Sequence, residues 1–190
     1  YTDGGIWIAV KGINPSYLAA ESALVDYSDY LHAKYGSDFI DIANTADDER
    51  AERRTSAFCQ TITDAGFKAP FIVNVGTTRT LRRGRDALNE IRAHSKKIDA
   101  VFCTSDLLAM GVVSEARDQR IQIPNQLSIM GFGNVPFISD LTPALSTVRI
   151  NGKTIGETAA RFLIERAEGH KVTPNILDIG FSLIERETTR

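Results

Sequence analysis

The residue types that most often carry enzyme chemistry are scarce in this 190-residue chain. The three histidines, His32, His94 and His170, have charged neighbours, which is typical of solvated helix positions. No two of them have metal-ligand spacing, and neither Cys59 nor Cys103 has a second ligand nearby. Nucleophile elbows and glycine-rich phosphate loops are also missing. We therefore expect no metal, no cofactor and no enzymatic activity.

An excess of positive charge and long apolar runs are missing too. The formal net charge is -2, so this chain has no electrostatic surface for nucleic acid, and any DNA contact must come from another part of the protein. No apolar run approaches the roughly 18 residues of a membrane span. The two cysteines follow apolar residues, as buried thiols in a reducing compartment do. We expect a cytoplasmic protein and, because the chain starts at Tyr1 instead of Met, a fragment or processed form.

Short apolar runs alternate with longer helical patterns along the chain. Expected strands cover residues 6–10, 38–42, 70–75, 100–103, 127–132, 145–148 and 176–184. Expected helices cover about 16–35, 47–65, 80–95, 105–119 and 151–168. Strands that alternate with helices pair in parallel, and strands that are apolar throughout have helices on both faces. The pattern predicts an α/β fold with a doubly wound parallel sheet.

Polar clusters follow four of the expected strands, at 44–54, 76–79, 104–106 and 133–134. In open parallel sheets, ligands bind at the carboxyl ends of the strands. Arginines in the first two clusters could clamp a carboxylate or paired hydroxyls. The alternative is that these arginines belong to solvated helix faces.

Three segments resemble motifs of one family of regulators. Residues 100–111 are similar to "A-hydrophobic-F-C-x-N-D-x-x-A-x-G", 123–132 to "V-P-x-D-hydrophobic-S-I-x-G-F", and 141–148 to "L-T-P-P-L-T-T-V". Their order and spacing resemble the lactose/galactose-repressor family, and the similarity runs from the strand at Ile6 to the "E-R-x-T-T" end at 185–189. Within the family, segments 48–50, 101–104 and 172–181 look most like those of gluconate-type repressors.

The resemblance implies an effector domain of two lobes, similar to a type I periplasmic binding protein. Residues 1–18 and 149–180 would form part of the N-terminal lobe, and 19–148 with 181–190 the C-terminal lobe. The helix-turn-helix headpiece and the first part of the N-terminal lobe would lie outside this chain. It further implies a repressor that acts as a homodimer, senses a small molecule and binds operator DNA through that headpiece.

The resemblance also suggests residues that bind the effector. Arg54 matches the arginine of "R-x-x-G-F", with Ala57 in place of the glycine. Asp48 and Arg50 lie in the same polar cluster. Arg79 occupies the position of a family residue that often stacks on the effector.

At the next two strand ends, the chain departs from the family. Ser105 stands in place of an asparagine that binds ligand, whereas Asp106 after it is expected to be a framework or capping residue. Gly133 replaces a carboxylate that accepts hydrogen bonds from sugar hydroxyls, and Asn134 follows it. Ile13 likewise replaces a common acid.

Losing two acids beside an added arginine makes the expected pocket more positive. We therefore expect a sugar acid such as gluconate as the effector. A neutral sugar is the alternative, if these positions simply drifted. A periplasmic sugar-binding protein of a transporter has the same fold and is the second function considered, and an α/β enzyme is the third.

Overall fold

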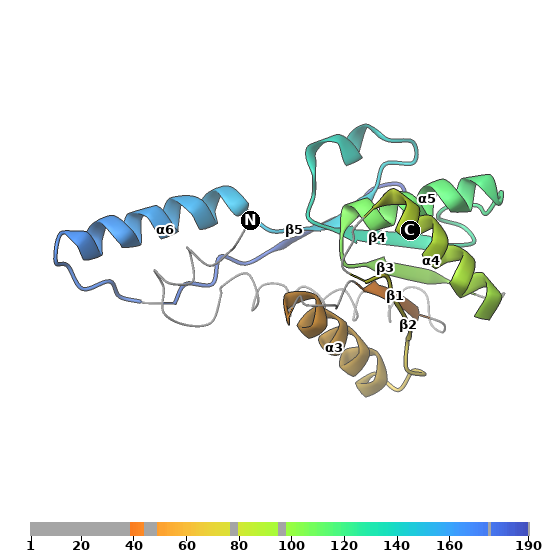
Figure 1. Ribbon diagram of the computed structural model, residues 1–190, viewed down its shortest axis with the longest axis horizontal. Helices are drawn as coiled ribbons and strands as arrows, with labels where there is room; N and C mark the ends of the chain where they lie inside the picture. Colours follow the sequence, from red (N-terminus) through yellow and green to blue (C-terminus); the bar gives the residue numbers. More distant parts are fainter. Residues whose placement is uncertain (1–38, 44–48, 77–79, 95–97, 175, 190) are drawn as a thin grey trace.

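The computed structural model describes residues 39–43, 49–76, 80–94, 98–174 and 176–189 (Figure 1). The strand expected at 6–10 and the helix expected at 16–35 lie outside these ranges.

A six-stranded sheet with the order β2-β1-β3-β4-β5-β6 organises the described part. The strands are β1 (Phe39–Ala43), β2 (Phe71–Asn74), β3 (Ala100–Cys103), β4 (Ser128–Phe132), β5 (Ser146–Arg149) and β6 (Ser182–Ile184). The helices are α3 (Glu49–Asp64), α4 (Leu81–His94), α5 (Asp106–Asp118), α6 (Gly152–Ala167) and the 3-10 helix η1 (Pro136–Asp140). Strands β1 to β5 pair in parallel, and β6 pairs antiparallel with β5.

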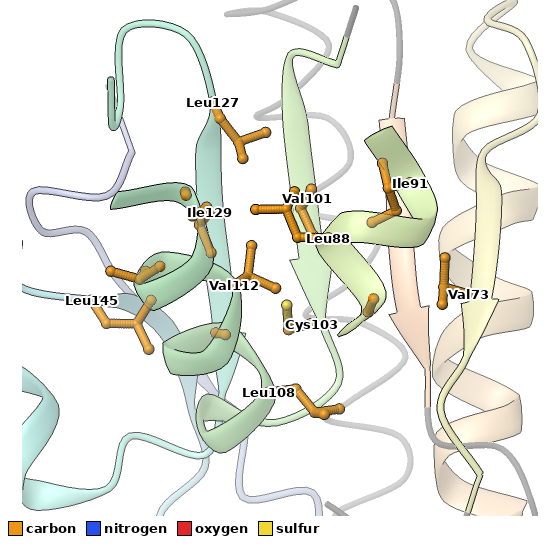
Figure 2. Close-up of a cluster of buried hydrophobic side chains, with 14 of the residues drawn as sticks. Val73, Leu88, Ile91, Val101, Cys103, Leu108, Val112, Leu127, Ile129 and Leu145 are labelled. Atoms are coloured by element: carbon orange, nitrogen blue, oxygen red, sulfur yellow. The ribbon is translucent and has the colours of Figure 1, made fainter. Parts of the chain in front are cut away.

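Helices cover both faces of this sheet, as the apolar strands predicted. Alternate residues of β3 point to opposite faces, so Val101 and Cys103 pack in the core under α4 and α5 (Figure 2). Phe102 packs on the other face against Phe58 of α3, with 5.5 Å between the ring centroids. Figure 1 shows α3 on one side of the sheet and α4 and α5 on the other. The doubly wound fold is confirmed.

Helices α4 and α5 cross where each has a glycine. A Cβ atom on Gly84 would collide with the backbone oxygen of Leu108, and one on Gly111 with that of Leu81. Beside this crossing, Arg85 of α4 reaches α5, where its Nη2 lies 2.8 Å from Glu115 Oε2 and 2.6 Å from Asp118 Oδ2. The two helices therefore form one tightly packed layer.

The strand expected at 176–184 is correct only for its last three residues. β5 has four residues, and only three of them pair with β6: Thr147 with Ile184, Val148 with Leu183 and Arg149 with Ser182. The apolar residues before β6 have no strand to pair with in the described part. Leu177 packs instead on Phe162 of α6, in a small cluster of its own. Figure 1 shows α6 extending away from the sheet.

Candidate functional site

The carboxyl ends of β3 and β4 bring four of the seven predicted site residues into one region. Ser105 follows β3, Gly133 and Asn134 follow β4, and Arg54 reaches the end of β4 from α3. This is the edge at which ligands bind in open parallel sheets.

The Arg54 guanidinium lies over the ring of Phe132, with 4.6 Å between Cζ and the ring centroid. Arg54 is only 6% exposed. It shares a helix face with Phe58 four residues later, and the contact of Phe58 with Phe102 fixes that face against the sheet. A buried cation on an aromatic ring is well placed to attract an anionic group. Arg54 was expected from its motif and Phe132 was not, although the position of Phe132 as the last residue of a strand before a polar loop was a usable signal.

Ser105 is the N-cap residue of α5. Its backbone is extended, and its Oγ accepts a hydrogen bond from the Leu108 amide at 3.3 Å. This bond satisfies one of the free N–H groups at the start of the helix. The hydroxyl proton of Ser105 remains available to a ligand, because a hydroxyl donates and accepts at the same time.

Asp106, at the start of α5, holds three segments together. Its Oδ2 accepts from the Val135 amide at 2.9 Å, and its Oδ1 accepts from Thr147 Oγ1 at 2.5 Å. The side chain is buried, and this burial raises its pKa, while bonds from Thr147 and the amides of Val135 and Asn134 oppose the shift. Asp106 therefore joins α5 to the loop after β4 and to β5, in agreement with the framework role that the sequence indicated.

Gly133 lies against this carboxylate. Its φ of 132° is one that residues with a side chain rarely adopt, and an added Cβ would lie 3.3 Å from Asp106 Oδ2. The loss of an acidic side chain at this position therefore goes together with a backbone conformation that suits glycine.

Asn134 also has a positive φ, of 60°, which asparagine tolerates better than most residues. Its Oδ1 accepts a hydrogen bond of 2.9 Å from Nη2 of Arg186, whose Nη1 donates to the Leu145 carbonyl at 2.6 Å. Arg186 was not expected as a neighbour of the site. The "E-R-x-T-T" ending was a signal, but nothing in it tells which loop the arginine reaches.

The same ending is tied to the sheet at several further points. Thr188 Oγ1 donates to the Ile129 carbonyl at 2.7 Å and accepts from the Ser146 amide at 2.8 Å. The Thr189 hydroxyl bonds to Ser146 Oγ at 2.7 Å. These buried bonds fix the C-terminal segment, and with it Arg186, across β4 and β5.

The structure does not describe the side chains of the other three predicted site residues. Asp48 and Arg79 lie outside the described residues, and Arg50 lies in the first turn of α3 with its side chain undescribed. In the described ranges, no group of three or more histidine, cysteine or acidic residues could hold a metal ion.

A cavity of about 460 Å³ lies elsewhere, along α5 and the loop before β5. Its lining includes Leu81, Met110, Val113 and Leu141, with Arg117 and Asp118 at polar positions. None of the predicted site residues that the structure describes lines it.

A family model described as a periplasmic binding protein-like domain matches residues 29–189, and the chain belongs to this family. The HTH-type transcriptional regulator GntR of Escherichia coli K12 is 31% identical over 136 residues, which cover 72% of this chain and 41% of that protein. The HTH-type transcriptional repressor PurR of Escherichia coli O1:K1 is 30% identical over 135 residues, or 71% of this chain and 40% of that protein.

Among solved structures, the transcription regulator GntR from Chromobacterium violaceum is similar with a TM-score of 0.79 and 25% identity, covering 90% of this chain and 63% of that one. These matches confirm the resemblance to effector-binding domains of the lactose/galactose-repressor family. The matched region spans about two fifths of the curated relatives. Those relatives are regulators and not enzymes, in agreement with the expectation from the sequence. In the part that the structure describes, no helix is long and apolar enough to cross a membrane.

Proposed function

We propose that this chain is the effector-sensing part of a transcription repressor and that its effector is a sugar acid such as gluconate. The observation that carries the proposal is the buried Arg54 guanidinium on Phe132, at the carboxyl ends of the parallel strands. The relatives named GntR and PurR support the regulator class.

The buried arginine and the loop after β4 support an anion over a neutral sugar as the ligand. Arg54 supplies a positive charge with little exposure to water. In the loop region, the carboxylate of Asp106 accepts its hydrogen bonds from Thr147 and backbone amides and lies buried behind Gly133. No acidic side chain at Gly133 opposes an incoming carboxylate, and Coulomb attraction to a desolvated guanidinium is strong.

Asp48, Arg50, Arg79, Ser105 and Asn134 complete the proposed effector site. Ser105 and Asn134 would bind ligand hydroxyls, and the arginines would share the contact with the carboxylate.

We further propose how effector binding would be passed on to DNA. In this proposal a helix-turn-helix headpiece outside this chain binds operator DNA, two copies associate as a homodimer, and the protein acts in the cytoplasm. Residues 1–18 and 149–180 contribute to the N-terminal lobe, and 19–148 with 181–190 form the C-terminal lobe. The separate apolar cluster of α6 supports this division. Effector binding between the lobes would then change the spacing of the two headpieces.

Isothermal titration of the full-length protein tests the effector class. Gluconate and related aldonates are titrated first, followed by the corresponding neutral hexoses. Arg54→Met removes the charge and keeps much of the side-chain length, and it should weaken aldonate binding at least tenfold, about 1.4 kcal/mol, because a charge-assisted bond is lost. Arg92→Met, an exposed arginine in the last turn of α4 at the opposite end of the sheet, is the matched control and should bind normally. Binding of neutral sugars alone would refute the sugar-acid proposal.

A further inference from the structure

The two N–H groups of Arg186 that face the effector loop and β5 are both occupied. Nη2 donates to Asn134 Oδ1 at 2.9 Å, and Nη1 donates to the Leu145 carbonyl at 2.6 Å. The Arg186 amide in turn donates to Ser146 Oγ at 2.8 Å. The guanidinium is therefore held by the sheet and reaches the loop from a rigid base.

This contact decides which way the Asn134 amide points. A guanidinium has donors only, so the carboxamide must turn its oxygen toward Arg186. The NH2 group then faces away and makes no hydrogen bond within the described part of the chain. The Asn134 main-chain amide is also engaged, by the Asp106 carboxylate. The NH2 group is thus the one donor that Asn134 can still offer to a ligand.

Asp106 holds the same loop through a second set of contacts. Asp106 interacts electrostatically with Arg186, and it accepts the Val135 amide at 2.9 Å. Hydrogen bonds to Asp106 and Arg186 therefore fix the loop at residues 134 and 135.

We infer that Arg186 is a positioning residue that makes the loop after β4 a hydrogen-bond donor to the effector, and thereby selects an anionic ligand over a neutral sugar. The inference rests on the proposed function. Gly133 offers no side-chain acceptor, and at Asn134 the acceptor oxygen is occupied by Arg186. An aldonate carboxylate accepts from the NH2 group in a charge-assisted bond, whereas a neutral sugar hydroxyl accepts from the same group more weakly.

Asn134→Asp is the most direct test, because it keeps the oxygen that accepts from Arg186 and replaces the NH2 donor with an acceptor. The aspartate can still accept from Arg186, as a charge-assisted bond, while its second oxygen faces the ligand as an acceptor with negative charge. We expect aldonate affinity to fall at least tenfold, neutral hexose affinity to hold or rise, and thermal stability to be maintained. Isothermal titration with gluconate and glucose gives the ratio of the two affinities.

Arg186→Lys provides the second variant, since lysine keeps the charge but cannot hold two acceptors in the fixed geometry of a guanidinium. A released Asn134 amide is free to rotate, so the ratio of gluconate to glucose affinity should fall severalfold. A purely structural role would lower both affinities by the same factor and leave the ratio unchanged. Arg149→Lys is the control, because Arg149 is exposed and bonds to Ser182 Oγ on the neighbouring strand at 3.3 Å. The ratio of gluconate to glucose affinity in Arg149→Lys should equal that of the wild type.

The outcomes separate this inference from the proposed function. If the wild type binds gluconate and Asn134→Asp binds it equally well, the donor role is wrong while the sugar-acid proposal stands. A ratio that does not move in Arg186→Lys also overturns the positioning role. A wild type that binds glucose only, or neither probe, overturns the sugar-acid proposal and this inference with it.

Discussion

Replacing Gly84 with alanine tests the close crossing of α4 and α5. An added Cβ would meet the backbone oxygen of Leu108, would lie 2.9 Å from the Gly111 Cα, and cannot move away by changing rotamer. The helices must separate instead, which loosens the contacts of Leu88 and Val112 in the core beneath them (Figure 2).

Two opposing effects determine the size of the change. Alanine is a better helix former than glycine by about 1 kcal/mol. Overpacking a well-packed core costs about 1–3 kcal/mol, and a collision with backbone belongs at the upper end of that range. We therefore expect Gly84→Ala to lower the free energy of unfolding by about 1–2 kcal/mol.

Gly156→Ala is the matched control, because Gly156 lies in the interior of α6 with nothing within 4 Å of an added Cβ. At this position only the higher helix propensity of alanine acts, so the free energy of unfolding should hold or rise by about 0.5–1 kcal/mol. Urea unfolding followed by far-UV circular dichroism measures both variants against the wild type. A Gly84→Ala protein as stable as the wild type would refute the close-crossing argument.

Three further predictions concern buried or paired polar groups. Asp106→Asn should lose about 1–3 kcal/mol in urea unfolding, because its NH2 group would face donors from Thr147 or Val135, and unchanged stability would contradict the framework role. The Thr55 hydroxyl is buried and has no hydrogen-bond partner in the described part of the chain, so Thr55→Val should hold or raise the melting temperature, whereas Thr61→Val loses a bond to the Ala57 carbonyl and should lower it. Bonds from Gln119, chiefly, and the charge of Arg85 lower the pKa of Glu115 below 4.5, so its stabilising contribution is complete above pH 4.5 and is lost as the pH falls through the lower folded pKa. Glu115→Gln should therefore unfold with less dependence on pH in that acid range, and an unchanged profile between about pH 3 and 6 would contradict the pairing.

Most of the described sheet could be predicted because its strands are short apolar runs that end at polar residues. The strand at 100–103 was predicted at its observed bounds, and the helix expected at 151–168 differs from α6 by one residue at each end. Asn151 caps that helix by accepting from the Thr154 amide at 3.1 Å, which is a local interaction visible in sequence. The strand at 176–184 was overestimated because strand length depends on a partner that apolar residues alone do not reveal.

The site was less predictable because its contacts join distant segments. Arg54 and Asp106 were found through motifs, but the ring beneath Arg54 belongs to a strand 78 residues later by the numbering, Phe132. Arg186 reaches Asn134 over a separation of 52 residues. Such pairs depend on strand order, and single-sequence periodicity does not determine it. Gly133 shows the same limit, since its proximity to Asp106 explains the glycine only once the fold is known.

Titration of the full-length protein with gluconate and with glucose tests the central claim most directly. We expect the wild type to bind gluconate, and to bind glucose at least tenfold more weakly. Arg54→Met should lose this preference. Equal binding of the two ligands, or gluconate binding unaffected by Arg54→Met, would contradict this claim.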